Sequence, residues 1–463
     1  MNKQTDTRSH RALSLSFGFS FEDLYNRDAL ARLDAVFLQE LQEAAPDLHG
    51  QLVAARLDTS AVTVKQQSEL IIAVAPHLED FIGKLFHIDK ALHDLQAKHS
   101  ELAPLYSVKR KFIQKKALTG YTPEKASLID GFAVAAELEA FTLEPLNERS
   151  YADHVARWME NESEHAEALR LAALYAAWAV LTPEGKKIHH HGILFRLPHK
   201  LDMLHLVPYA SVETHGLVQL QFRPDQWRTR EGFQLTDAGT NLTGALDQAN
   251  YCIKCHNQGK DSCSHGLKEK DGSFKASVFG VKLAGCPLEE KISEMNVLKG
   301  DGVPIGALAV VTIDNPMAAA TGHRICNDCM KSCIFQKQEP VDIPQVETRT
   351  LKDVLELPWG FEIYGLLTRW NPLNFERPFP REATGKKVLV VGLGPSGFTL
   401  SHHLMNDGHT VFATDGLKIE PLPADISGVD PHGNRVPFRP LVAEDSASGP
   451  RRESRTSAAK ADQ

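Results

Sequence analysis

The seven cysteines of this chain all lie in one stretch, residues 251–338, and the rest of its 463 residues has none. Their spacing is C-x2-C-x7-C-x22-C-P followed by C-x2-C-x3-C. Two thiolates separated by two residues can bind the same iron or zinc site, because the turn between them directs both sulfurs inward. A Cys-Pro step after the fourth thiolate also recurs in bacterial ferredoxins. The stretch is therefore a candidate metal-binding block, formed by Cys252, Cys255, Cys263, Cys286, Cys326, Cys329 and Cys333.

Three kinds of chemistry compete for these thiols. Disulfides are disfavoured because no signal peptide precedes the block and the number of cysteines is odd. Structural zinc fits the paired C-x2-C units but would leave three cysteines over. Iron–sulfur clusters fit best, and two [4Fe–4S] clusters need eight ligands where the chain offers seven thiols. We therefore expect one ligand that is not a cysteine.

A glycine-rich motif follows the block, in the sequence GKKVLVVGLGPSGFTLSHHLMNDGHTVFATD. We expect a strand over 388–391, a helix over 396–406 and a second strand over 410–414. In such a unit the first glycine allows a tight turn, the second lets the backbone approach a pyrophosphate, and the third packs helix against strand. An acid after the second strand would bind ribose hydroxyls. The candidate dinucleotide-binding residues are Gly392, Gly394, Pro395, Ser396, Gly397 and Asp415.

Residues 245–420 resemble the small subunit of bacterial NADPH-dependent glutamate synthase and the matching region of dihydropyrimidine dehydrogenase. The resemblance lies in CIKC, the isolated Cys263, GCP, RICNDCMKSC, EPVDIPQVE and GKKVLVVGLGPSG. It implies a small helical domain with two [4Fe–4S] clusters that leads directly into an FAD-binding Rossmann unit. Two departures from the family are an insertion between Cys263 and Cys286 and a second cysteine group that is compressed and one cysteine short.

The resemblance also implies how the thiols are shared. Cys252, Cys255, Cys263 and Cys333 would hold one cluster, and Cys286, Cys326 and Cys329 three corners of the other. The family places a Glu or Gln after a P-V-x-I-x-x-[IV] stretch, which here is residues 340–346, so Glu347 is the expected eighth ligand. Other donors near enough to be considered are Gln336, Gln338, His256, His265 and His323.

The fold class that we predict is mainly α and multidomain, with an incomplete α/β Rossmann unit. Helical periodicity extends from residue 21 to about 183, and Pro76 should bend or break one of its helices. Residues 189–191 are histidines, but adjacent side chains diverge, so a metal site there is not favoured. The predicted segments are a flexible N-terminus (1–20), a helical domain (21–183), short extended pieces (184–239), the iron–sulfur domain (240–358), a linker packed along a surface (359–384), the partial Rossmann unit (385–440) and a disordered tail (441–463).

The functional expectation is an iron–sulfur electron-transfer module of an FAD-dependent, NAD(P)H-linked oxidoreductase. Only 48 residues follow Asp415, so a partner chain or a further C-terminal flavin and NAD(P)H domain is expected to complete the sheet. The alternative is a non-catalytic scaffold with a zinc- or cluster-stabilised domain and a vestigial Rossmann unit. The net charge of −8 argues against a nucleic-acid partner, no apolar run approaches 18 residues, and no catalytic side-chain set stands out. Free thiols indicate a reducing compartment, the cytoplasm.

Overall fold

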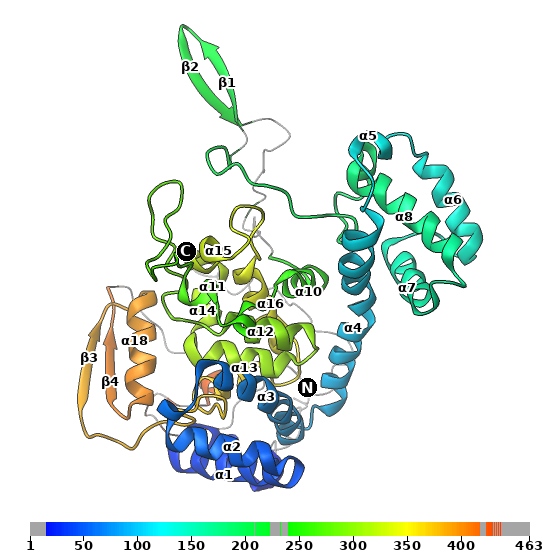
Figure 1. Ribbon diagram of the computed structural model, residues 1–463. Coiled ribbons are helices and arrows are strands. Elements are labelled where there is room, and N and C mark those ends of the chain that lie inside the picture. The colour runs from blue at the N-terminus through cyan, green and yellow to red at the C-terminus, as the bar shows by residue number, and fades with distance from the viewer. Residues whose placement is uncertain are drawn as a thin grey trace, which may run out of the picture. The chain divides into compact units, whose positions relative to one another are not determined.

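The structure is a computed structural model that describes residues 15–207, 209–222, 239–416 and 423–428, with residues 232, 430, 432, 434 and 436 besides. It is mainly helical, as the sequence predicts (Figure 1). The chain forms two compact units. Unit 1 contains residues 1–95, 303–322 and 350–463, and unit 2 contains residues 96–302 and 323–349. The predicted disordered tail, 441–463, lies outside the described residues.

Unit 1 is built on α1 (Arg27–Ala44), α2 (Pro46–Leu57), α3 (Val64–Phe86), α13 (Pro304–Asp314) and α17 (Gly360–Leu367). Side-chain caps begin two of these helices: Asn26 accepts from the first turn of α1, and Thr63 forms a capping box with Gln66 at the start of α3. Of the predicted bend or break at Pro76, the break does not occur, since α3 runs unbroken through this residue. An interior proline costs about 3 kcal/mol. The buried Leu, Ile and Phe side chains of α3 contribute about 1.5–3 kcal/mol each, so together they outweigh it.

Aromatic side chains fill the core of unit 1. The rings of Phe37, Phe81 and Trp370 pack with centroids 5.5–6.0 Å apart. Trp370 and Trp359, in the segment predicted as a linker packed along a surface, are both fully buried. That segment instead contains α17 and contributes to the core, because its tryptophans fit between residues of α1 and α3 and neighbouring loops.

A buried ion pair lies beside this aromatic core. The guanidinium of Arg56 donates to both oxygens of Asp34, at 2.7 and 3.2 Å, and to the carbonyl of Pro372 at 2.9 Å. The indole Nε1–H of Trp370 also donates to Asp34, at 3.1 Å. These bonds connect α1, α2 and the segment after α17.

The apolar stretch 305–313 lies in the buried helix α13. It belongs to unit 1, where it packs against α3, whereas the cysteines belong to unit 2. The two helices approach closely at Gly306, since a Cβ there would lie 3.0 Å from the Cβ of Ala75.

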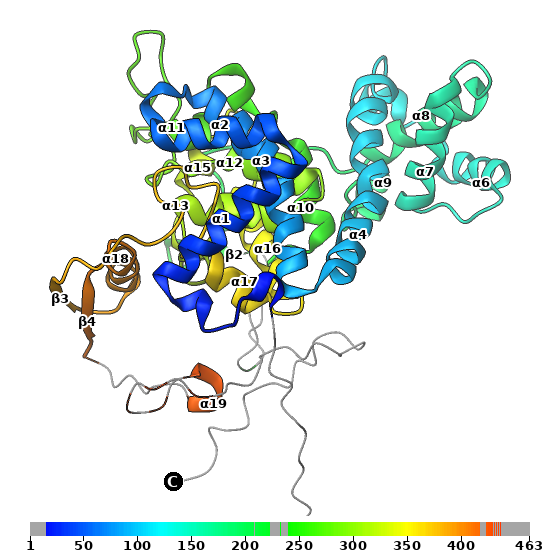
Figure 2. The same ribbon diagram turned by 90° about the horizontal axis from the view of Figure 1, so that it is seen from below.

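The glycine-rich motif, also in unit 1, forms a β-α-β unit from β3 (Lys387–Val391), α18 (Pro395–Asn406) and β4 (Thr410–Thr414). The strands pair in parallel, from Lys387 opposite Thr410 to Val391 opposite Thr414. α18 lies along one side of this two-stranded sheet (Figures 1 and 2).

Unit 2 combines α10 (Leu242–Tyr251), α12 (Ile292–Gly300) and short helices around the cysteines with a helical part that follows α4. In the helical part, Phe112, Ile113, Leu171, Tyr175 and Trp178 contribute to one core. Two helices follow one another here: Thr122 caps α5 and Asp130 caps α6. The bounds in this part are α4 (Asp89–Val108), the π-helix η4 (Lys109–Ala117), α5 (Pro123–Ala126), α6 (Gly131–Thr142), α7 (Glu148–Trp158), α8 (Ala166–Leu181) and α9 (Pro183–Ile188).

The predicted extended pieces include an antiparallel hairpin of β1 (Tyr209–Thr214) and β2 (Leu217–Phe222). Its two-residue turn, His215-Gly216, has positive φ at both positions, which suits the twist of a hairpin. The remaining helices are η1 (Ser16–Gly18), η2 (Asp23–Tyr25), η3 (Thr59–Ala61), η5 (Met159–Asn161), η7 (Cys255–Gln258), α11 (Ser262–His265), α14 (Ala318–Ile325), α15 (Asp328–Ser332), α16 (Ile343–Leu355) and α19 (Ala424–Ser427).

Candidate functional site

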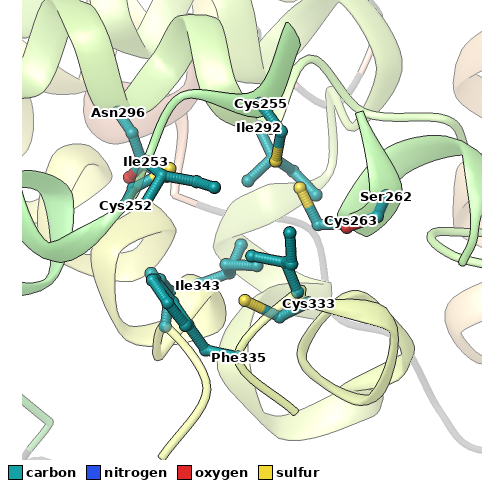
Figure 3. A pocket seen from close by; sticks show the side chains of 12 residues that line it. Cys252, Ile253, Cys255, Ser262, Cys263, Ile292, Asn296, Cys333, Phe335 and Ile343 are labelled. Atoms are coloured by element: carbon teal, nitrogen blue, oxygen red, sulfur yellow. The ribbon is translucent and has the colours of Figure 1, made fainter. Parts of the chain in front are cut away.

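Four thiols line one small cavity in unit 2. They are Cys252, Cys255, Cys263 and Cys333, the set that the family resemblance implies for one cluster. The sulfurs of Cys255 and Cys263 point into the space between the surrounding chain segments (Figure 3). Apolar side chains, among them Ile292, complete the wall. We call this space the four-thiol cavity.

Each of the four thiols lies in or next to a helix: Cys263 belongs to the short helix α11. Cys252 follows the last residue of α10, Cys255 begins η7, and Cys333 follows α15. Between the first two, Lys254 adopts a left-handed conformation with φ of 56°, which is uncommon for a residue other than glycine. This local turn aims both sulfurs of the C-x2-C unit at the same cavity.

The four-thiol cavity is shielded from water. Burial raises the pKa of Cys252 to about 11 and holds the pKa values of Cys263 and Cys333 above their ordinary value. The buried Ser262 hydroxyl on the cavity wall has no hydrogen-bond partner within the described part of the chain. Metal ligands bind as thiolates, so a positively charged group entering here would displace thiol protons. Four buried thiols and a polar hydroxyl suit an iron–sulfur cluster.

The second cysteine group lies next to the first. The amide of Cys286 donates to the carbonyl of Cys263 at 2.9 Å. The preceding Gly285 has a φ of +88°, and a Cβ there would come within 2.4 Å of the carbonyl oxygen of Ser264. Glycine at this position therefore permits the close approach of the two segments.

Two carboxylates accompany the three thiols of the second group. Burial raises the pKa of Cys329, and negative charge on Cys286, Glu290, Cys326 and Glu347 raises it further, so these five groups are neighbours. Glu347 is 7% exposed and Glu290 is 9% exposed. Burial raises the pKa of Glu347 well above its usual range. The hydrogen-bonded carboxyl of Glu290 raises this pKa further.

Glu290 is the residue that sequence reasoning missed. Its only signal is a position four residues after Cys286, in the run Cys-Pro-Leu-Glu-Glu. Of the other candidate donors, Gln338 donates to the hydroxyl of Tyr251 at 2.7 Å, and His265 lies 3.6 Å from Glu289. His256 is buried, Gln336 is partly exposed, and the side chain of His323 lies outside the described residues.

Within the described ranges, no three His, Cys, Asp or Glu side chains lie close enough to hold a single metal ion. A [4Fe–4S] cluster requires a different arrangement of ligands, because its four cysteines surround the cluster instead of binding one metal ion. The four thiols likewise surround the four-thiol cavity. The histidine run takes part in packing: the ring of His189 lies against Tyr175 and Phe195.

The glycine-rich motif brings its six predicted residues together at the carboxyl end of β3. Gly392 has a φ of +93°, and a Cβ on Gly397 would lie 1.7 Å from the Gly392 carbonyl oxygen. Gly394 faces open space, and Pro395 and Ser396 form the first turn of α18. A carboxylate oxygen of Asp415 accepts a hydrogen bond from the amide of Leu393, which fixes the acid beside the turn.

The sheet of this unit has one uncovered face. Leu389, Val391 and Phe412 project from the same side of β3 and β4 and are exposed. Parallel strands are normally covered on both faces. Residues 417–422, which begin three residues after the end of β4, lie outside the described part of the chain.

Fold and site together define a mainly helical protein with a buried cysteine-lined centre and a dinucleotide-type β-α-β unit. A model of the family described as "RP005 N-terminal alpha-helical domain" matches residues 15–87. The uncharacterized protein RP005 of Rickettsia prowazekii (strain Madrid E) is 31% identical over 302 residues, which is 62% of this chain and 98% of that protein. The chain therefore belongs to the RP005 family.

Two other similarities cover smaller parts of the chain. The uncharacterized protein RP006 of the same organism is 61% identical over 110 residues, and the chain spans only 16% of its length. The glutamate synthase [NADPH] small chain of Mycobacterium tuberculosis (strain CDC 1551 / Oshkosh) is 32% identical over 128 residues, 27% of this chain and 23% of that protein. About a quarter of this chain is thus similar to about a quarter of that small chain. In the described residues, no helix combines the length and apolar character needed to cross a bilayer.

Proposed function

We propose that this chain is the iron–sulfur electron-transfer module of an FAD-dependent, NAD(P)H-linked oxidoreductase. The observation that supports this best is the position of Cys333. Seventy residues of chain separate it from Cys263, yet it lines the same cavity as Cys252, Cys255 and Cys263. These four side chains would hold one [4Fe–4S] cluster, which supplies one-electron transfer when bound.

The protein's own contribution is to orient the ligands and exclude water. Ile292 and the other apolar side chains of the wall keep the four-thiol cavity dry, which affects the reduction potential of a bound cluster. Cys286, Cys326 and Cys329 would hold a second [4Fe–4S] cluster with Glu347 as its fourth ligand. All seven cysteines are free thiols, which supports a reducing compartment such as the cytoplasm.

Cysteine substitutions test the partition of ligands. Anaerobically purified wild-type protein should contain about eight irons per chain and absorb broadly near 400 nm. Cys333→Ser and Cys263→Ser should each lose the same electron paramagnetic resonance signal, and Cys329→Ser should lose the other. Met330→Ser, between the two groups, is the control and should keep both. A colourless wild-type protein with stoichiometric zinc would refute the proposal and favour the scaffold alternative.

The carboxylate pair needs its own test. Glu347→Ala should remove about one cluster's iron, whereas Glu290→Ala should keep the full iron content and shift only the spectrum of the second cluster. A carboxylate binds iron more weakly than a thiolate, so that cluster should be the more labile of the two in wild-type protein. Iron loss in Glu290→Ala but not in Glu347→Ala would transfer the ligand assignment to Glu290.

We further propose that the glycine-rich motif binds FAD in preference to NAD. Gly394 faces open space beside the amino terminus of α18, where a pyrophosphate would be stabilised by the helix dipole. Affinity should be low, since the sheet has only two described strands. Separate calorimetric titrations with FAD and NADPH test the assignment, and tighter binding of NADPH would contradict it.

A further inference from the structure

A second hollow in unit 2 lies directly beside the four-thiol cavity. Its volume is about 130 Å³, and Ile253 and Phe335 line both spaces. Tyr106, Arg110 and Asn250 form another part of its wall and continue into an adjoining hollow of about 300 Å³. These two hollows, which we call the outer cleft, are open to the surface. The outer cleft is thus separated from the four buried thiols by the thickness of one or two side chains.

The rim of the outer cleft is basic. The π-helix η4 has five basic residues in the run KRKFIQKKA, and three of them, Lys109, Arg110 and Lys111, line the outer cleft. Lys109 is buried and paired with Asp247 at 2.7 Å, but Arg110 and Lys111 are exposed and form no ion pair with any described residue. Extended π-helices are rare and occur often at functional sites. A basic rim on a chain with a net charge of −8 indicates a specific negatively charged partner.

The floor of the outer cleft is apolar and aromatic. The ring of Tyr251 stacks on Phe335 with a centroid distance of 4.5 Å and an interplanar angle of 12°. The neighbouring Ile334 lines the four-thiol cavity and is 46% exposed. A small apolar centre with a charged rim is typical of transient electron-transfer interfaces, in which charge steers the encounter and the buried area stays small.

We propose that the outer cleft is the docking site of an acidic electron-carrier protein. The proposal rests on the proposed function, because it needs a redox group at the four thiols. The carrier would accept one electron: the carrier is reduced, the group held by the thiols is oxidised, and no bond forms or breaks. We choose an acidic protein as the partner because of charge complementarity: the basic side chains of η4 extend beyond the hollow itself. A small anionic ligand would need only the hollow.

The test measures binding, so it does not depend on turnover. The probe is oxidised flavodoxin, an acidic carrier protein, titrated calorimetrically into the full-length protein at low ionic strength. The double variant Arg110→Glu/Lys111→Glu should bind at least tenfold more weakly than wild type, and the neutral pair Arg110→Gln/Lys111→Gln should fall between them. Added salt should weaken wild-type binding. The control, Lys270→Glu/Lys282→Glu, makes the same charge change at exposed lysines outside the cleft and should bind like wild type.

The outcomes separate this proposal from the one it rests on. The docking site is refuted, even if both clusters are present, if wild-type protein does not bind flavodoxin. It is also refuted if Arg110→Glu/Lys111→Glu binds flavodoxin as strongly as the control Lys270→Glu/Lys282→Glu does. Binding that is lost only in Arg110→Glu/Lys111→Glu supports the docking site, and missing iron in the same preparations would then count against the proposed function alone. Binding of free flavin mononucleotide that requires Arg110 would also overturn the proposal, in favour of a small-ligand site.

Discussion

Glu79 connects two helices of unit 1 that are far apart in sequence. It lies in α3, is 1% exposed, and its carboxylate accepts the amide hydrogens of Ile305 at 2.7 Å and Gly306 at 3.2 Å. Both amides belong to the first turn of α13, where helical N–H groups have no partner within the helix. The negative charge also stabilises the positive end of the helix dipole.

The contribution of Glu79 to the free energy of unfolding follows from the groups that a substitution would leave unpaired. Glu79→Ala leaves two buried amides without their acceptor, at about 1–3 kcal/mol each. Removing a buried charge offsets part of that loss. We expect the free energy of unfolding to fall by about 3 kcal/mol. Glu79→Gln keeps the volume and one acceptor oxygen, so its expected loss is about 1–2 kcal/mol.

Urea denaturation followed by tryptophan fluorescence measures this change, because the buried Trp359 and Trp370 report on unit 1. Glu69→Ala is the matched control: it lies on the same helix but is exposed, in a surface pair with Lys65, and should cost less than about 1 kcal/mol. A loss in Glu79→Ala no larger than in Glu69→Ala would refute the reasoning.

Three further predictions concern unit 1. Asp34→Ala leaves the buried guanidinium of Arg56 without its carboxylate and should lower the free energy of unfolding by about 3–5 kcal/mol, measured by the same denaturation. Gly397→Ala forces a methyl group into the Gly392 carbonyl, so calorimetry should detect no FAD binding; binding equal to wild type would show that the motif is not the site. Burial lowers the pKa of His402 to about 4 from 6.5, so the unfolded chain binds a proton that the folded chain does not between those pH values. Stability should therefore fall as pH drops through that window, less steeply in His402→Gln, and a His402 pKa near 6.5 by NMR titration would contradict this.

Local signals in the sequence predicted local structure well. The predicted strand, helix and strand around the glycine-rich motif are present, and the glycines lie where their spacing places them. These features depend on hydrogen bonds and backbone angles within a few residues. The placement of Cys333 beside Cys263 came from resemblance to a known family, since spacing alone does not reveal which distant thiols meet.

Features that depend on distant packing were harder to predict. Pro76 looked like a break because its missing hydrogen bond is local, whereas the burial that keeps α3 continuous comes from other segments. Segment 359–384 was predicted to pack along a surface, but nothing in the sequence near its tryptophans shows which residues would enclose them. Glu290 belongs to no recognisable motif. Its place beside the second cysteine group becomes visible only in the fold, where it hydrogen-bonds to Glu347, 57 residues later.

The alternation of the chain between the two units has a consequence for synthesis on the ribosome. Domains usually fold in order as they emerge, at about 5–20 residues per second. Here the first 95 residues belong to a unit whose next segment starts at residue 303. Translating the roughly 200 residues between them takes about 10–40 s. During that time α3 has no α13 to pack against, and the helix face around Ala75 lacks its final neighbours. The nascent chain should therefore depend on chaperone protection before α13 emerges, and a fragment ending near residue 300 should aggregate although it contains every residue of α1 to α3.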